Sequence, residues 1–177
     1  MKVLVRLFAL GIVCLGVVLP LSRAYSAALE DRPDASIFYP FIGSWKGKGQ
    51  ITEAGNKPAD LSIAIFCVKA SDGYAVSCKM SANNKDMSIS ESDLFGVDPV
   101  TGKGHWFAVS NQGETHDHVA TWTDDNTLKA GYSWTQDGKK MQEDTTIILP
   151  NEKTMEFTTV VSADGAETTS FHGKLTR

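Results

Sequence analysis

Histidine offers the clearest potential for chemistry in this sequence, because His105, His116 and His118 lie close together along the chain. His116 and His118 are two residues apart, so on a β-strand their side chains share one face. If Ser110 pairs with Gly113 across the intervening turn, His105 lies opposite His118 on that face. Three neutral imidazoles in one patch are ligands for Zn²⁺ and leave a fourth position open. The alternative is a register shifted by one residue, which moves His105 to the other face. The histidines then lie on the barrel wall or face solvent and do not form a metal site.

Other reactive side chains are not arranged for catalysis. The sequence has no Gly-x-Ser-x-Gly motif and no Gly-rich phosphate loop. The serines within Ser88–Ser92 alternate as on an exposed strand, and the acidic pairs Asp124-Asp125 and Glu143-Asp144 are expected in turns or on strand faces that meet water. The sequence therefore predicts no catalytic residue and identifies no cofactor.

Two cysteines, Cys67 and Cys78, lie at equal distances from the turn dipeptide Asp72-Gly73. If that dipeptide is the centre of a hairpin, the cysteines face each other directly. Opposed residues on antiparallel strands have Cα atoms ~4.5–5.5 Å apart, which a disulfide can bridge. The sequence predicts a disulfide here, and two buried free thiols are the alternative.

The elements that position these residues are short runs of alternating polarity separated by turn residues such as Asp137-Gly138 and Asp164-Gly165. This pattern is typical of antiparallel strands joined by hairpins. A short helical turn is expected near Asp34–Phe41. The predicted strands are Trp45–Glu53, Leu61–Lys69, Tyr74–Ala82, Met87–Val97, His105–Ser110, Glu114–Thr123, Thr127–Thr135, Lys140–Leu149, Thr154–Ser162 and Glu167–Thr176.

An open sheet of about ten strands has two exposed edges, and closing it into a barrel removes them. The sequence therefore predicts an all-β fold, a single antiparallel up-and-down β-barrel wide enough to enclose a ligand cavity. The candidate ligand-binding residues are Phe107, Trp122, Trp134 and Phe157. The other apolar residues expected to line the interior are Ile63, Ile65, Ile148 and Phe171.

Closure of such a barrel places the last strand beside the first. Leu175 and Arg177 then share the inner face with Phe171, and Arg177 comes to lie over the indole ring of Trp45. Such a cation–π contact contributes roughly 0.5–2 kcal/mol. Trp45 and Arg177 are therefore predicted to have structural roles.

The segment Phe41–Gly49 contains a Gly-x-Trp sequence that resembles the opening of the calycin barrels, the lipocalins and fatty-acid-binding proteins. Together with Leu94–Asp98, Thr121–Thr123 and Lys174–Arg177, it is similar to a bacterial family, domain of unknown function 1579. The resemblance extends from Phe41 to Arg177. It implies a lipocalin-like barrel with a Trp–Arg pairing of the same kind, and it brings no activity and no catalytic residue.

Haem-binding barrels distantly similar to this family use a histidine near the C-terminus as an axial ligand. Here His172 alternates with Phe171 and Gly173, which are expected on the inner face. His172 is therefore predicted to face solvent.

The N-terminal segment, residues 1–27, has the order of a secretory signal peptide: Lys2 and Arg6, an apolar run over Leu7–Leu21, then small residues. A membrane anchor is the alternative, but about 15 apolar residues fall short of the ~20 that a spanning helix needs, and Pro20 interrupts the run. We expect cleavage, an exported periplasmic or secreted protein, and one lipocalin-like domain over residues 28–177.

Removal of Lys2, Arg6 and Arg23 takes the formal net charge from −4 to −7. An acidic protein disfavours nucleic acid and anionic membranes as partners, and no stable membrane insertion is expected after cleavage. The predicted function is binding of a small apolar or amphipathic molecule, and the sequence does not predict an enzyme. The alternative is a metal-binding protein or metal-dependent enzyme that uses His105, His116 and His118, and a filled core without a ligand is a third possibility.

Overall fold

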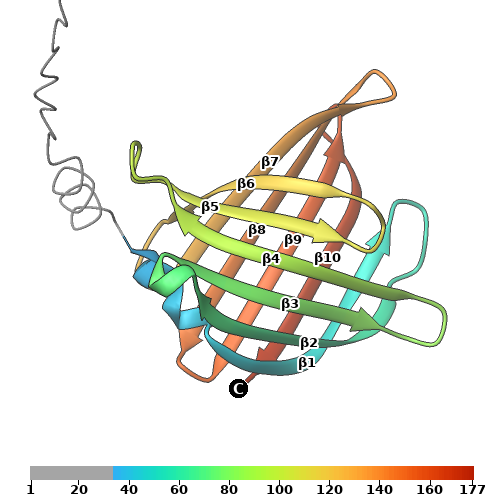
Figure 1. The fold of residues 1–177 in the computed structure, drawn as a ribbon. Helices are drawn as coiled ribbons and strands as arrows, with labels where there is room; N and C mark the ends of the chain where they lie inside the picture. The colour runs from blue at the N-terminus through green and yellow to red at the C-terminus, as the bar shows by residue number, and fades with distance from the viewer. Residues whose placement is uncertain (1–33) are drawn as a thin grey trace, which may run out of the picture. The chain divides into compact units, whose positions relative to one another are not determined.

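The computed structural model describes residues 34–177, which form a closed antiparallel barrel of ten strands preceded by a 3-10 helix (Figure 1). This architecture confirms the predicted all-β up-and-down barrel. The predicted signal peptide, residues 1–27, lies outside the described residues. In chain order the elements are η1 Ala35–Phe41, β1 Gly43–Glu53, β2 Ala59–Ala70, η2 Ser71–Gly73, β3 Ala75–Asn83, β4 Ser88–Val97, β5 Gly104–Ser110, β6 Thr115–Trp122, β7 Thr127–Gln136, β8 Lys139–Asn151, β9 Thr154–Ala163 and β10 Ala166–Thr176.

Each strand pairs with its neighbours in sequence, and the pairing of β1 with β10 closes the barrel. The register of this closing pair runs from Lys46 opposite Thr176 to Glu53 opposite Thr169. At Gly47 an added Cβ would lie 2.0 Å from the backbone oxygen of Lys174. Glycine at this position therefore lets β1 and β10 approach closely enough to close the sheet.

One end of the barrel is closed by η1, which packs against β3 and β4. Asp34 begins the helix by accepting a hydrogen bond from the Ser36 backbone N–H at 2.9 Å. The rings of Phe38 and Phe41 lie 5.3 and 5.5 Å from the ring of Phe95 on β4. This aromatic cluster forms the floor, and the opposite end of the barrel, where β5 meets β6 and β7 meets β8, is the mouth.

The chain end completes the floor. The Arg177 guanidinium lies 4.2 Å from the Trp45 ring centre and donates a hydrogen bond of 2.7 Å to the Pro40 carbonyl. The Trp45 indole, fully buried, donates a hydrogen bond of 2.7 Å to the Phe41 carbonyl. Trp45 thereby ties β1, η1 and the C-terminus together, and Figure 1 shows that terminus beside β1.

Cys67 on β2 lies opposite Cys78 on β3, in the predicted register, and a disulfide joins the two residues. Their Cα atoms are 4.1 Å apart. Both side chains are buried on the inner face, with relative exposures of 1% and 3%. The disulfide therefore crosslinks two neighbouring strands of the barrel wall from the inside.

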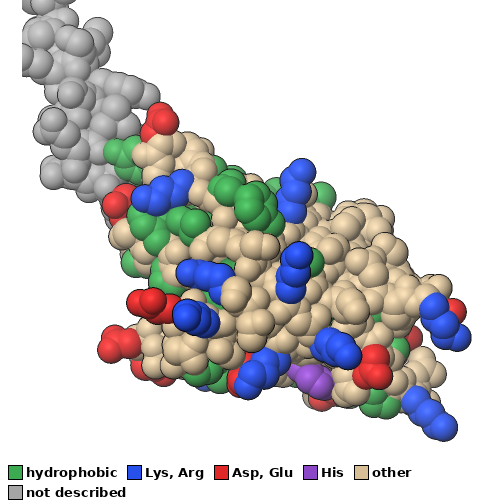
Figure 2. Space-filling view, turned by 90° about the horizontal axis from the view of Figure 1, so that it is seen from below, with side chains coloured by type: hydrophobic (Ala, Val, Ile, Leu, Met, Phe, Trp, Pro, Cys, Tyr) green, Lys and Arg blue, Asp and Glu red, His purple; other side chains and the backbone are tan. Residues whose placement is uncertain are grey.

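Charged side chains occupy outward-facing positions of the strands, where polar residues alternate with the inward-facing apolar ones. On the face shown in Figure 2, Lys and Arg side chains lie singly, interspersed with Asp and Glu. Lys174 and Glu156, on β10 and β9, form an ion pair of 2.7 Å on the exterior. Within residues 34–177, no helix is both long and apolar enough to cross a membrane.

Candidate functional site

The interior of the barrel contains two adjoining cavities. The inner one has a volume of about 140 Å³ and is lined mostly by apolar side chains, including Ile65, Phe95, Ile147 and Phe157. The second, of about 310 Å³, lies at the mouth, and its lining includes Trp134. The residues that line both cavities are Glu91, Trp106, Glu143, Thr159 and Phe171. The boundary between the two cavities is therefore polar.

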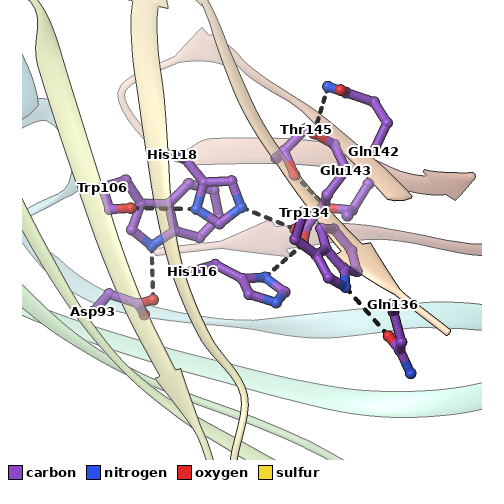
Figure 3. Close-up of polar contacts among 10 residues, drawn as sticks. Asp93, Trp106, His116, His118, Trp134, Gln136, Gln142, Glu143 and Thr145 are labelled. Atoms are coloured by element: carbon purple, nitrogen blue, oxygen red, sulfur yellow. Dashed lines mark hydrogen bonds and ion pairs between the residues drawn. The ribbon is translucent and has the colours of Figure 1, made fainter. Parts of the chain in front are cut away.

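A cluster of His116, His118 and Glu143 lies at this boundary (Figure 3). His116 and His118 are on β6, and Glu143 is on β8. His116 Nδ1 lies 2.8 Å from Glu143 Oε2, and His118 Nε2 lies 3.2 Å from Glu143 Oε1. One carboxylate therefore contacts both imidazoles through its two separate oxygens.

Aromatic rings hold the two imidazoles in place. The ring of Trp106 stacks on His118 with 4.6 Å between the ring centres, and Tyr132 stacks on His116 at the same distance. Trp134 lies beside them, with its ring centre 5.1 Å from that of His116. Because the His118 side chain is only 1% exposed and that of His116 is 17% exposed, both rings have little freedom to turn.

Two further acidic residues, Glu91 and Asp93, lie on β4 and face the inner cavity. The Trp106 indole donates a hydrogen bond of 2.8 Å to Asp93 Oδ1. Burial, the negative charge of Asp93 and hydrogen bonding with Asp93 raise the pKa of Glu91 to about 9. Burial also raises the pKa of Asp93, against the opposing hydrogen bonds from Glu91 and Trp106. Burial and mutual repulsion therefore favour the protonated form in both carboxyl groups of this pair.

Glu143 differs from these two carboxyl groups, although it is also buried. Burial raises the pKa of Glu143. Contact with His118 and the positive charges of His118 and His116 lower this pKa by more than burial raises it, so the net shift is downward. The barrel interior thus contains a protonated carboxyl group, Glu91, and an ionised one, Glu143, and both line the two cavities.

The predicted register of the β5–β6 hairpin is wrong by one residue. Ser110 pairs with Glu114, and His105 lies opposite Val119 and not opposite His118. The cause is a three-residue loop that ends in Gly113, which has a φ of +83°. Such a loop needs a left-handed residue at its last position, and glycine supplies it.

This shift places two candidate residues on the outer face. His105 contacts Asp117 at 3.0 Å there, so the structure does not bring it into the cluster of His116 and His118. Phe107 is 44% exposed and does not line the barrel interior. The predicted three-histidine cluster and the predicted contact of Phe107 with a ligand are therefore both corrected.

The other candidate ligand-binding residues face the interior at different depths. Phe157 lines the inner cavity and packs edge-on against Phe171, with ring centres 4.9 Å apart. Trp134 lines the mouth cavity. Trp122 instead stacks on Phe41 of the floor, with 5.9 Å between ring centres, and is not among the described residues that line either cavity.

Two further predictions concern strand faces. Ile148 was expected inside but is 38% exposed, and its neighbour Ile147 lines the inner cavity. His172 is exposed on the outer face, as predicted. The error at Ile148 arises because two adjacent isoleucines leave the inward face of β8 undecided.

Sequence reasoning missed the three carboxyl groups of the site that face the barrel interior. Glu91 and Asp93 are spaced by even numbers of residues from Phe95, and Glu143 is so spaced from Ile147, so on a strand each shares a face with that apolar residue. Acidic residues on the apolar face of a predicted strand were the signal that could have found them, because an unpaired buried charge is costly and is retained only with a partner.

The fold and the site define a lipocalin-like β-barrel with a polar group at the mouth of an apolar cavity. A solved structure of Rv2717c from M. tuberculosis is similar, with a TM-score of 0.60, 15% identity, and coverage of 82% of this chain and 99% of that chain. The S-type phycobiliprotein lyase CPES from Guillardia theta is also similar, with a TM-score of 0.55, 12% identity, and coverage of 84% of this chain and 95% of that chain. At these identities the similarity establishes the fold alone.

Neither a protein-family model nor a curated protein sequence matches the chain. The lipocalin-like architecture therefore rests on the structure, and the resemblance to the domain of unknown function 1579 family stays a prediction.

Proposed function

We propose that this protein binds a small amphipathic molecule inside the barrel, with the apolar part in the inner cavity and the polar part at the mouth. The observation that carries the proposal is the mostly apolar cavity inside the barrel, which ends at a cluster of polar side chains. Ligand sites are typically concave and apolar, with a few polar groups that fix the orientation of the ligand. The polar groups here are Glu91, His116, His118 and Glu143.

The volumes limit the size of the ligand. The inner cavity of about 140 Å³ is close to the ~150 Å³ of an apolar protein cavity that holds benzene. It therefore accommodates one aromatic ring or a short alkyl chain. The mouth cavity of about 310 Å³ offers room for a larger polar portion beside Trp134.

Export belongs to the same proposal. The N-terminal order of residues 1–27 and the disulfide between Cys67 and Cys78 support it, because disulfides persist in oxidising compartments. Membership of the domain of unknown function 1579 family is likewise proposed. Mass spectrometry of the protein recovered outside the cytoplasm tests export, since we expect a mass that lacks the first 26 or 27 residues. An intact chain would contradict signal-peptide cleavage.

An uncharged naphthylamine probe tests ligand binding. We expect it to bind at micromolar concentration, to quench tryptophan emission because Trp106 lines both cavities, and to be displaced by a medium-chain acyl ligand. A probe that fails to bind the wild-type protein would overturn the proposal.

Two adjacent isoleucines on β8 supply a matched control. Ile147→Trp adds a large ring where the side chain lines the inner cavity, whereas Ile148→Trp adds the same ring on the exposed outer face. We expect Ile147→Trp to abolish probe binding and Ile148→Trp to retain it, with folding of both variants verified by circular dichroism. Equal binding by the two folded variants would place the ligand outside the cavity.

A further inference from the structure

We infer that His116, His118 and Glu143 form a binding site for one divalent transition-metal ion. Each residue offers one ligand atom, and these atoms all lie within 4.8 Å of one another. The observed contacts of 2.8 and 3.2 Å are close to the ~3.3–3.4 Å between ligand atoms of a tetrahedral site with bonds of ~2.0–2.1 Å. Small movements of the side chains are therefore enough to seat the ion.

The hydrogen bonding of His118 shows which of its nitrogens is the ligand atom. His118 Nδ1 lies 3.2 Å from the backbone carbonyl of Trp106, which can only accept a hydrogen bond. Nδ1 therefore carries a proton, and in a neutral ring Nε2 presents its lone pair to Glu143. Metal-bound histidines characteristically donate their other N–H to a carbonyl or carboxylate in this way.

The orientation of the His118 ring relative to Glu143 suits a metal ion between the two side chains better than a hydrogen-bonded proton. Within the described part of the chain, the buried atom His118 Nε2 has no hydrogen-bond partner, although Glu143 Oε1 is only 3.2 Å away. A hydrogen bond needs the proton close to the line between its two atoms. A metal ion lies off that line, at the apex of the triangle formed with the two ligand atoms, so this arrangement suits it.

The surroundings also favour a cation. The described residues that line the two cavities include Glu91, Asp93, Glu114 and Glu143, and they include no lysine or arginine. A buried carboxylate without a nearby fixed positive charge is costly. Histidines that bind a metal are neutral, so a divalent ion held by Glu143 would take over the positive charge that protonated His116 and His118 otherwise supply.

Two imidazole nitrogens and one carboxylate oxygen select the kind of metal. Mg²⁺ and Ca²⁺ prefer oxygen ligands throughout, whereas Zn²⁺ and its neighbours in the first transition row accept this mixed set. Three protein ligands leave at least one coordination position open. Since His116, His118 and Glu143 all line the mouth cavity, that position faces the space where a water or a polar ligand group can enter.

The inference is independent of the proposed binding of an amphipathic molecule, and its test uses zinc and cobalt alone. Calorimetric titration of chelator-treated protein with ZnCl₂ is expected to show one ion per chain. Cobalt(II) at the same site is expected to give the intense visible bands of a four- or five-coordinate ion with nitrogen ligands. Stoichiometry well below one ion, or the weak spectrum of hexaaqua cobalt, would overturn the inference.

Variants identify the ligands. His116→Ala and Glu143→Gln are the first choices, because both side chains keep some exposure and Glu143→Gln preserves shape, whereas His118 is fully enclosed. We expect each variant to lower zinc affinity at least 100-fold while its melting temperature without metal shows that it is folded. His105→Ala removes the outward-facing histidine and is expected to change affinity less than twofold. Wild-type affinity in the first two variants, or an equal loss in the third, would contradict the assignment.

Discussion

At the scale of single residues, the neighbouring side chains determine whether each interior carboxyl group is protonated or ionised. Glu91 is affected by the negative charges of Asp93, Glu143 and Glu114, so burial and like charge both favour its protonated form. Glu143 has His118 and His116, which favour the ionised form despite burial. One apolar barrel therefore holds a carboxylic acid and a carboxylate side by side, and the neighbouring side chains make the difference.

Glu91 is expected to make stability depend on pH. Its pKa in the folded protein, about 9, exceeds the ordinary 4.5, so the folded state keeps a proton that the unfolded state releases. The free energy of unfolding therefore falls as pH rises from about 4.5 to 9, by up to about 1.4 kcal/mol per pH unit. Chemical denaturation of Glu91→Gln across this range is expected to show a flatter dependence than wild type.

Glu152, in the exposed turn between β8 and β9, is the control for this effect. Glu152→Gln is expected to leave the pH dependence unchanged. A wild-type slope retained in Glu91→Gln would mean that the buried pair does not hold the extra proton.

At the scale of elements, the sequence predicts all ten strands, with ends within two residues of those observed. It does so because turn residues and alternating polarity are local signals. The hairpin of Cys67 and Cys78 was also predictable, since Asp72-Gly73 marks its centre. Two of the three residues of the proposed metal site, His116 and His118, were predicted, but Glu143 was not, because it lies on β8, beyond β7 and 25 residues from His118 in the sequence, and no local pattern encodes that contact.

The β5–β6 hairpin shows why register is harder to predict than strand position. Two-residue and three-residue loops are both compatible with its turn sequence, and the choice moves every side chain on one strand to the other face. Gly113 determines the outcome, because its φ of +83° suits the longer loop. His105 and Phe107 were misplaced for this single reason.

Gly113→Ala is expected to destabilise the protein by about 1 kcal/mol. An added Cβ at this position would meet no atom within 4 Å, so the cost comes from the left-handed backbone alone. Equilibrium denaturation in urea measures it. Gly96 lacks a positive φ, and its added Cβ would make only an ordinary contact of 3.7 Å, so Gly96→Ala is the control and is expected to cost less. Equal costs would mean that the loop conformation does not need glycine.

The disulfide gives a second prediction at this scale. Cys67 and Cys78 are separated by 11 residues, and closing a loop of that length stabilises the folded state by about 3 kcal/mol on the chain-entropy estimate. Reduction of the native protein is expected to lower its free energy of unfolding by that amount. A thiol assay on the oxidised, denatured mature protein is expected to find no free thiol. Two reactive thiols would show that the pair is reduced.

At the scale of the whole molecule, the barrel is closed at one end and accessible at the other, and the position of the site follows from this asymmetry. The floor is filled by η1, Trp45 and Arg177, so no ligand enters there. The histidines and Glu143 lie on the mouth side of the inner cavity. Loss of the floor would therefore loosen the barrel at the end remote from the site.

The contact between Trp45 and Arg177 tests this closure. Trp45→Ala is expected to cost about 3–5 kcal/mol, because it leaves a cavity at a fully buried aromatic and removes the indole hydrogen bond to Phe41. Arg177→Ala is expected to cost less, since its side chain contributes the contact at 4.2 Å and one hydrogen bond to Pro40. A double-mutant cycle measured by denaturation is expected to give a coupling of roughly 0.5–2 kcal/mol. Full additivity of the two substitutions would show that the chain end does not stabilise the floor through Trp45.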